Sequence, residues 1–242
     1  MVTDLKNASG SLKDSSNKNY EFVANITHEL KTPLTSIIGF IEFLKKDGAK
    51  NKKTREYFYD IIDSEAQRLL RLIDDFLLLS QIENSEYTKL SQKCYIKKEI
   101  ETVLKTLLPI AKVKNIDIYI DMDEDLTLYA SSIRLQQLFS NLINNAIKYN
   151  VNNGKIFIKA YTEEKYVRIN IKDTGIGIDR EHINKIFDRF YRVNTENTSE
   201  IPGNGLGLSI VKDIVALYGG NIKINSEVGK GSEFIISFPQ SV

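Results

Sequence analysis

Cysteine and histidine are scarce in this sequence of 242 residues, and their scarcity excludes several kinds of site. Cys94 is the lone cysteine, so neither a disulfide framework within one chain nor a cysteine-rich metal site can form. This usage fits a reducing compartment, and we therefore expect a cytoplasmic location. Of the two histidines, His182 has no motif around it and is expected at the surface, which leaves His28 as the candidate reactive group.

Long apolar runs and an excess of one charge are also absent. No run approaches the roughly 18 apolar residues that a membrane span needs, and no signal peptide is expected. Thirty-three basic and 32 acidic residues give a net charge of +1, so no overall field favours nucleic acid or anionic lipid. We expect no nucleic-acid partner and no membrane segment in this chain. The 42% apolar content is enough for a real core, in one or two domains.

Two long amphipathic patterns predict a helical hairpin near the N-terminus. Apolar residues recur at steps of three or four from Phe22 to Leu44 and again from about Thr54 to Glu83. Two helices are too thin to bury both apolar faces, so we expect a dimeric four-helix bundle; the alternative is a hairpin docked on the second domain. We assign residues 19–88 to this domain and the polar residues 1–18 to a linker or cut end.

Beyond residue 88 the pattern changes to short strands among helices, which predicts a second domain over residues 89–242. Helices and strands in this order favour an α/β sandwich with its helices on one sheet face, and so an α+β class for the chain. Helices are expected over Lys97–Val113, Ser131–Lys148 and Leu208–Tyr218. Strands are expected over Ile116–Ile120, Leu126–Ala130, Lys155–Tyr161, Tyr166–Lys172, Asn221–Ile224 and Ser232–Phe238.

His28 lies in an unusual helical segment. Glu29 is beside it, Thr32 follows four residues later on the same face, and Pro33 would leave the carbonyl of Glu29 without its helical partner. A nucleophilic ring beside a carboxylate suggests a reactive site. For Thr32, the structural alternative is a hydroxyl that bonds its own upstream carbonyl.

Three further segments carry residues suited to a nucleotide. Asn141, Asn145 and Lys148 form one polar stripe, in which amide oxygens suit Mg²⁺ and the lysine suits phosphate, although a solvated face is an alternative. Residues 173–178 read Asp-Thr-Gly-Ile-Gly-Ile after a predicted strand, and a glycine-rich stretch over residues 203–209 opens a predicted helix, where phosphate commonly binds. Residues 181–202 between them are expected to form a lid.

In this order and spacing the motifs resemble those of the sensor histidine kinases of two-component signalling, over about residues 20 to 240. The nucleotide domain also resembles, more distantly, the wider GHKL (Bergerat) superfamily of ATPases that includes Hsp90, gyrase B and MutL. The resemblance implies an enzyme that uses ATP and Mg²⁺ to phosphorylate His28 and then transfers the phosphoryl group to an aspartate of a response-regulator receiver domain. It also implies a homodimer and a full-length parent anchored in the cell membrane.

The resemblance further implies a role for each site residue. His28 would be the nucleophile, Glu29 its base, and Thr32 the group that positions water to dephosphorylate the regulator. Asn145 would bind Mg²⁺, and Asp173 the adenine amino group. The remaining nucleotide-binding residues would be Asn141, Lys148, Tyr149, Gly175, Gly177, Arg192, Gly203, Gly205, Leu206, Gly207 and Leu208.

Two other functions remain open from the residues. One is a nucleotide-gated ATPase or protein-serine kinase of the related superfamily, which would not need His28. The other is a non-catalytic dimerisation module that only senses nucleotide. Incubation with labelled ATP distinguishes a histidine kinase from both alternatives, because only a histidine kinase should carry acid-labile label that is lost when His28 is replaced.

Overall fold

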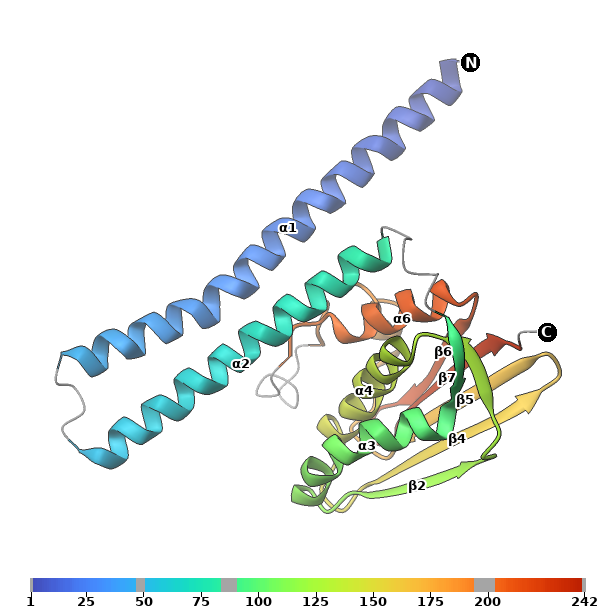
Figure 1. Ribbon diagram of the computed structural model, residues 1–242. Helices are drawn as coiled ribbons and strands as arrows, with labels where there is room; N and C mark the ends of the chain where they lie inside the picture. Colours follow the sequence, from blue (N-terminus) through green and yellow to red (C-terminus); the bar gives the residue numbers. More distant parts are fainter. Residues whose placement is uncertain (1, 47–50, 84–90, 194–202, 241–242) are drawn as a thin grey trace. The chain divides into compact units, whose positions relative to one another are not determined.

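The computed structural model describes residues 2–46, 51–83, 91–193 and 203–240, and the chain divides into two compact units (Figure 1). The first unit comprises residues 1–77 and the second residues 78–242. The predicted boundary at residues 88 and 89 lies outside the described residues. Within the described ranges, no helix combines the length and the apolar character that crossing a membrane requires.

The hairpin consists of α1 (Val2–Lys45) and α2 (Lys52–Glu83), and the first unit contains α1 and α2 as far as Leu77. Aromatic rings join the two helices near the turn: Phe58 on α2 lies 5.3 Å from Phe40 and 4.9 Å from Phe43, measured between ring centroids. The prediction of a hairpin is therefore confirmed. The C-terminal end of α1 and both ends of α2 agree with the predicted ends within two residues.

Helix α1 differs from prediction at its beginning. Residues 2–18 were expected to lack regular structure, but α1 already begins at Val2. Extending an existing helix fixes one residue per hydrogen bond and avoids the cost of nucleation, so serine, asparagine and even Gly10 are accommodated where no proline intervenes. Composition alone could not indicate this, because the helix is propagated from the apolar segment that follows.

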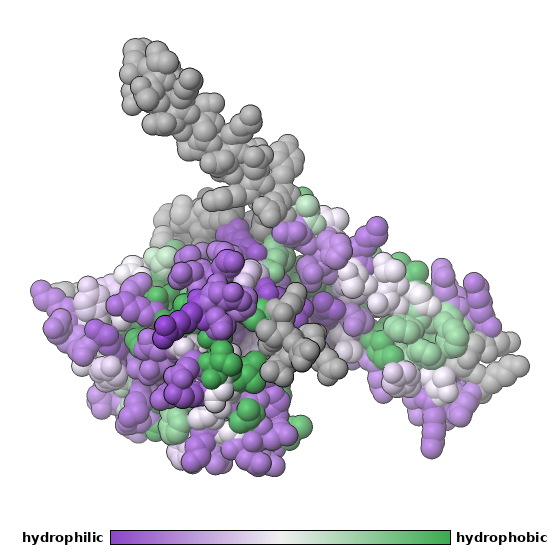
Figure 2. Space-filling model, turned by 180° about the vertical axis from the view of Figure 1, so that it is seen from behind, coloured by the Kyte–Doolittle hydropathy of each residue, from purple (hydrophilic) through white to green (hydrophobic). Residues whose placement is uncertain are grey.

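A row of apolar side chains remains exposed on the hairpin. Leu34, Ile38 and Ile41 are 38–49% exposed, and they are spaced four and three residues apart on α1. On α2, Leu70, Ile73 and Leu77 are 39–56% exposed at steps of three and four. Figure 2 shows hydrophobic surface at the hairpin's turn end. Such a stripe at bundle spacing is suited to packing against further helices.

The second unit is built on a five-stranded sheet. Its order is β2 (Asp117–Met122), β4 (Lys155–Glu163), β5 (Tyr166–Asp173), β7 (Gly231–Pro239) and β6 (Asn221–Glu227). Only β2 and β4 run parallel; the other neighbours are antiparallel. Alternate residues face one layer, so the registered neighbours Ile158, Ile171 and Phe234 are buried together.

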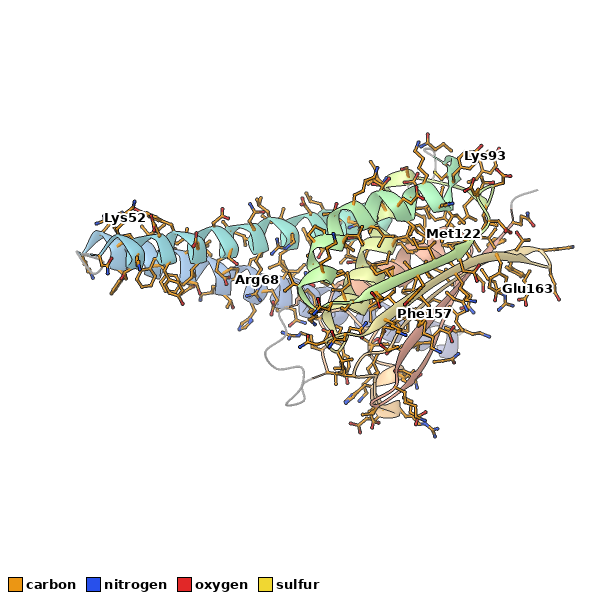
Figure 3. The ribbon with its side chains drawn as sticks, turned by 90° about the horizontal axis from the view of Figure 1, so that it is seen from below. Lys52, Arg68, Lys93, Met122, Phe157 and Glu163 are labelled. Carbon is orange, nitrogen blue, oxygen red and sulfur yellow. The ribbon has the colours of Figure 1, made fainter. Side chains whose placement is uncertain are left out.

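Three helices cover one face of this sheet: α3 (Ile96–Val113), α4 (Ser132–Lys148) and α6 (Gly207–Leu217) (Figure 1). Leu138 and Phe139 on α4 and Ile210 on α6 are fully buried in the core between the layers. On the opposite face, Phe157 (labelled in Figure 3) stacks with Tyr119, at 5.2 Å between ring centroids, and Tyr119 stays 47% exposed. The predicted two-layer α/β sandwich is confirmed.

Two short elements were not predicted. Strand β1 (Gln92–Tyr95) pairs with β3 (Thr127–Ala130) in a separate two-stranded sheet, and α5 (Arg180–Ile183) is a single helical turn capped by Asp179. The single turn of α5 contains too little periodicity to be recognised, and β1 depends on a partner more than thirty residues away.

Candidate functional site

His28 lies on an exposed part of α1. Thr32 is exposed one turn later, and its hydroxyl donates a hydrogen bond to the His28 carbonyl oxygen at 3.1 Å. This is the structural alternative that the sequence left open for Thr32. Helix α1 continues through the buried Pro33, so proline removes one hydrogen-bond donor without ending the helix.

Glu29 is directed towards the other helix of the hairpin. Its Oε2 lies 3.7 Å from Nη2 of Arg68 on α2, and Arg68 in turn lies 3.7 Å from Glu65 (Figure 3 labels Arg68). Consecutive residues of a helix project about 100° apart, which explains why Glu29 and His28 face different surroundings. Both ion pairs are long and partly exposed, so they leave the carboxylate able to change partner.

The polar stripe of α4 faces the entry of α6. Asn141 and Asn145 are partly exposed, whereas their neighbours Leu142 and Ala146 are buried. A Cβ atom at Gly207, the first residue of α6, would lie 3.2 Å from Oδ1 of Asn141. Among the described residues, the buried Nδ2 atom of Asn141 has no hydrogen-bond partner. The stripe thus has unused polar capacity, as a ligand site requires.

At the end of α4, four sequence-predicted residues converge. Nζ of Lys148 lies 4.9 Å from the ring centroid of Tyr149, and it would be 2.6 Å from a Cβ at Gly203. Burial, followed by the charge of nearby Arg192, lowers the pKa of Lys148 to about 8. The pKa of the Tyr149 phenol is raised by burial, which Arg192 partly offsets. Two cations held together in this way favour a polyanion.

Asp173 forms the floor of a loop at the end of β5. Its side chain is 6% exposed, and Oδ1 accepts hydrogen bonds from the amides of Gly175 (2.8 Å) and Ser232 (3.3 Å). Burial raises the pKa of this carboxyl to about 6, although both hydrogen bonds act in the opposite direction. Among the described residues no partner is recorded for Oδ2, which leaves this oxygen available to a donor on a ligand.

Two positions in this loop require glycine, because other backbone segments lie too close to leave room for a Cβ atom. A Cβ at Gly175 would lie 2.2 Å from the carbonyl oxygen of Tyr149, and the same oxygen accepts the amide of Ile176 at 3.0 Å. Gly177 has a φ of +70°, and its Cβ would lie 2.0 Å from the carbonyl oxygen of Glu227. The loop is therefore fastened to both α4 and the β6–β7 turn.

The second glycine-rich segment begins α6. Gly205 has a φ of +72°, its carbonyl accepts the amide of Phe190 at 3.0 Å, and the Asn204 side chain accepts the amide of Leu206. Leu206 is buried, while Leu208 is partly exposed. Within the described part of the chain, the N-cap residue Leu206 makes no side-chain cap hydrogen bond, so the first amides of α6 and its positive dipole end can meet an anion.

The stem of the predicted lid is partly described. Arg189 pairs with Asp213 on α6 at 3.3 Å, and His182, expected at the surface, is half-buried and bonded to the hydroxyl of Tyr191 at 2.7 Å. Residues 194–202 of the predicted lid lie outside the described residues.

Sequence reasoning missed three residues that build this site. Asn150 is buried next to Tyr149, donates to the Lys155 carbonyl and contacts Thr174, so it joins α4 to the Asp173 loop. Ser232 supplies an amide to Asp173, and Lys114 binds the end of α4. Only Asn150 gave a signal, since it directly follows the polar stripe.

The chain matches two family models. One is described as the His Kinase A (phospho-acceptor) domain and matches residues 18–85. The other is described as histidine kinase-, DNA gyrase B- and HSP90-like ATPase and matches residues 130–242. The matched segments contain His28 and the polar and glycine-rich motifs, respectively.

Curated relatives cover nearly the whole chain. Sensor histidine kinase WalK of Bacillus subtilis is 33% identical over 90% of this chain and 36% of its own length. Signal transduction histidine-protein kinase ArlS of Staphylococcus aureus is 37% identical over 94% of this chain and 50% of its own length. The chain thus spans half or less of these relatives.

Solved structures show the same fold. The histidine kinase AdeS of Acinetobacter baumannii superposes with a TM-score of 0.74 at 25% identity, over 89% of this chain and 98% of that one. The histidine kinase ThkA, in complex with the response regulator protein TrrA, superposes with a TM-score of 0.69 at 28% identity, over 91% of this chain and 61% of that one.

Proposed function

Since this chain belongs to the sensor histidine kinases of two-component signalling, we propose that it phosphorylates its own His28 with ATP and then transfers the phosphoryl group to an aspartate of a response-regulator receiver domain. The observation that carries the proposal is the buried Asp173, which uses Oδ1 for two backbone amides and keeps Oδ2 for an exocyclic amine such as that of adenine. An exposed histidine in the same chain supplies the acceptor.

The nucleotide would bind between the two glycine-rich segments. Asp173 accepts a hydrogen bond from the adenine amino group, Gly175 and Gly177 shape the pocket, and Tyr149 packs near the adenine. Lys148 and Arg192 neutralise the phosphates. The backbone of Gly203, Gly205, Leu206, Gly207 and Leu208 wraps the triphosphate, and amides at the start of α6 bind its phosphate oxygens.

A magnesium ion fits the amide oxygens of the α4 stripe. Asn145 would hold the ion, because a hard cation takes oxygen ligands. Asn141 would lie beside it, where its unpartnered Nδ2 can donate to a phosphate oxygen. When bound, Mg²⁺ neutralises charge on the phosphate oxygens. The residues of the chain that contact the phosphates orient the triphosphate.

The chemical step is an in-line displacement. The Nε2 lone pair of His28 attacks the γ-phosphorus, the bond from phosphorus to the bridging oxygen breaks, and ADP leaves with its electrons. The new phosphoramidate loses the proton on Nδ1, for which Glu29 is the nearby base once it leaves Arg68. A carboxylate oxygen of the regulator then attacks phosphorus, and the bond from phosphorus to nitrogen breaks.

Thr32 would serve a reverse function, in which its hydroxyl positions water against the phosphorylated regulator. Its position one turn from His28 and its exposure support this role. The hydroxyl must first rotate away from the His28 carbonyl.

The hairpin would assemble with a second copy of itself. Leu34, Ile38 and Ile41 with Leu70, Ile73 and Leu77 supply the unburied stripe that a four-helix bundle requires. We further propose that this catalytic portion works in the cytoplasm, in a parent protein anchored in the cell membrane, in line with the sensor kinases that it matches.

The test is labelling with γ-³²P ATP and Mg²⁺, followed by acid and base treatment of the labelled protein. Wild type should carry label that is labile to acid and stable to base, because a phosphoramidate has this behaviour. His28→Gln should carry none, whereas His182→Gln, the control, should keep it. An unlabelled wild type would contradict the proposal. Label that persists in His28→Gln would point to the related serine kinases.

A further inference from the structure

We propose that Lys114, which follows α3, is a positioning residue that holds the end of α4 and thereby fixes Lys148 against the nucleotide phosphates and Tyr149 beside the adenine pocket. This inference rests on the proposed nucleotide site. It concerns a residue outside every motif, whose side chain reaches the site only through the backbone of α4.

The ammonium group of Lys114 lies at the C-terminal end of α4, where three backbone oxygens converge. Nζ donates to the carbonyl of Lys148 at 2.7 Å, to that of Ile147 at 3.1 Å and to that of Asn150 at 3.4 Å. An ammonium has three hydrogens, so the three oxygens match its donor capacity. The group is partly buried, which strengthens charge-assisted bonds of this kind.

These bonds satisfy carbonyl oxygens at this helix end. The last carbonyls of a helix have no amide partner within it, and they carry the negative end of the helix dipole. Lys114 binds the carbonyls of residues 147, 148 and 150, and the amide of Ile176 binds that of Tyr149. One cation and the Asp173 loop therefore hold the final turn together.

The turn held in this way carries the phosphate-facing groups. Lys148 presents its Nζ beside Gly203 and over the Tyr149 ring, and its own carbonyl makes the shortest bond with Lys114. The Lys114 carbonyl also accepts the amide of Asn153 at 2.9 Å, so the residues after α4 are held from both sides. Loosening this turn moves the cation that should meet the phosphates, while the buried face of α4 stays packed.

The experiment compares Lys114→Met, Lys114→Arg and Lys112→Met in the full chain. Lys112 is an exposed lysine in the last turn of α3 and serves as the matched control. We measure ADP affinity by calorimetry, the KM and kcat for ATP in autophosphorylation, and the melting temperature. Lys114→Met should weaken ADP binding and raise KM about tenfold, as expected for losing a charge-assisted contact, with kcat within about twofold. Lys114→Arg should recover part of the affinity, and Lys112→Met should match wild type.

A double-mutant cycle separates positioning from general stabilisation. In a Lys148→Met background, adding Lys114→Met should cost little further affinity, because the group that it positions is gone. The inference would be overturned if the losses of ADP affinity in the two single variants added fully, or if Lys114→Met bound ADP as tightly as wild type. In either case, labelling of the wild type would still uphold the proposed function. A wild type without nucleotide binding would overturn both. Should Lys114→Met fail to fold, Lys114→Gln, which keeps two donors, replaces it in the same cycle.

Discussion

Replacing Asp173 with asparagine should stabilise the empty second unit at neutral pH and abolish nucleotide binding at the same time. The asparagine Oδ1 can still accept the amides of Gly175 and Ser232. Its Nδ2 then stands where Oδ2 faced the adenine amino group, so a donor meets a donor. The buried charge, which the folded state must desolvate, is removed.

The magnitude follows from the pKa of Asp173, which burial raises from 3.8 to about 6. Below pH 3.8 the carboxyl is protonated in both folded and unfolded states and costs nothing. Between pH 3.8 and about 6 the unfolded chain ionises first, so stability falls as the pH rises. Above pH 6 the full cost is present, about 3 kcal/mol for two pKa units. Weaker hydrogen bonds from a neutral amide offset part of the gain, which leaves about 1–2 kcal/mol in favour of the variant.

The assay is thermal unfolding of wild type and Asp173→Asn from pH 4 to pH 8, with the exposed Asp117→Asn as control. At pH 8 Asp173→Asn should melt about 4 °C above wild type, and the two curves should converge towards pH 4. Calorimetry with ADP should detect binding to wild type and none to the variant. A difference in melting temperature that does not change with pH, or a variant less stable at pH 8, would refute the reasoning.

Two further outcomes concern the phosphate site and the hairpin. Because the pKa of Lys148 is lowered to about 8, raising the pH from 7 to 9 removes its charge. The ADP affinity measured by calorimetry should therefore fall severalfold in wild type but not in Lys148→Arg. The same pH dependence of ADP affinity in both proteins would contradict this. Ile38→Asp places a charge in the exposed apolar stripe and should convert a dimer to a monomer in analytical ultracentrifugation, whereas the exposed polar substitution Lys31→Gln should not. A dimeric Ile38→Asp variant would place the interface elsewhere.

Periodicity predicted the long elements of the fold well. Helices α2, α3, α4 and α6 and the strands of the main sheet bury apolar residues at regular steps, and this local pattern is readable in one sequence. Strand β1 depends on a distant partner, and residues 2–18 continue a helix whose cause lies downstream. The sequence of β1 does not contain its distant partner, and residues 2–18 do not contain the apolar segment that propagates the helix.

The candidate site was predictable where side chains act directly. Asp173, Lys148 and the glycines belong to motifs, and the structure places them around one loop and one helix end. Residues that act through the backbone gave no signal: Lys114 is one lysine among many until its Nζ is seen against three carbonyl oxygens. The orientation of Glu29 towards Arg68 likewise depends on hairpin geometry.

The unbroken course of α1 also sets a rotational phase for His28. Each residue of an α-helix turns the chain by about 100°, and α1 runs from Val2 past His28 without interruption. One residue inserted ahead of His28 therefore swings any segment joined at residue 2 by more than a quarter of a turn relative to the imidazole. Seven inserted residues bring that segment back to within about 20°. A domain grafted onto this helix thus keeps its angular relation to His28 only when the number of inserted residues is close to a whole number of helical turns, such as about seven or about eleven.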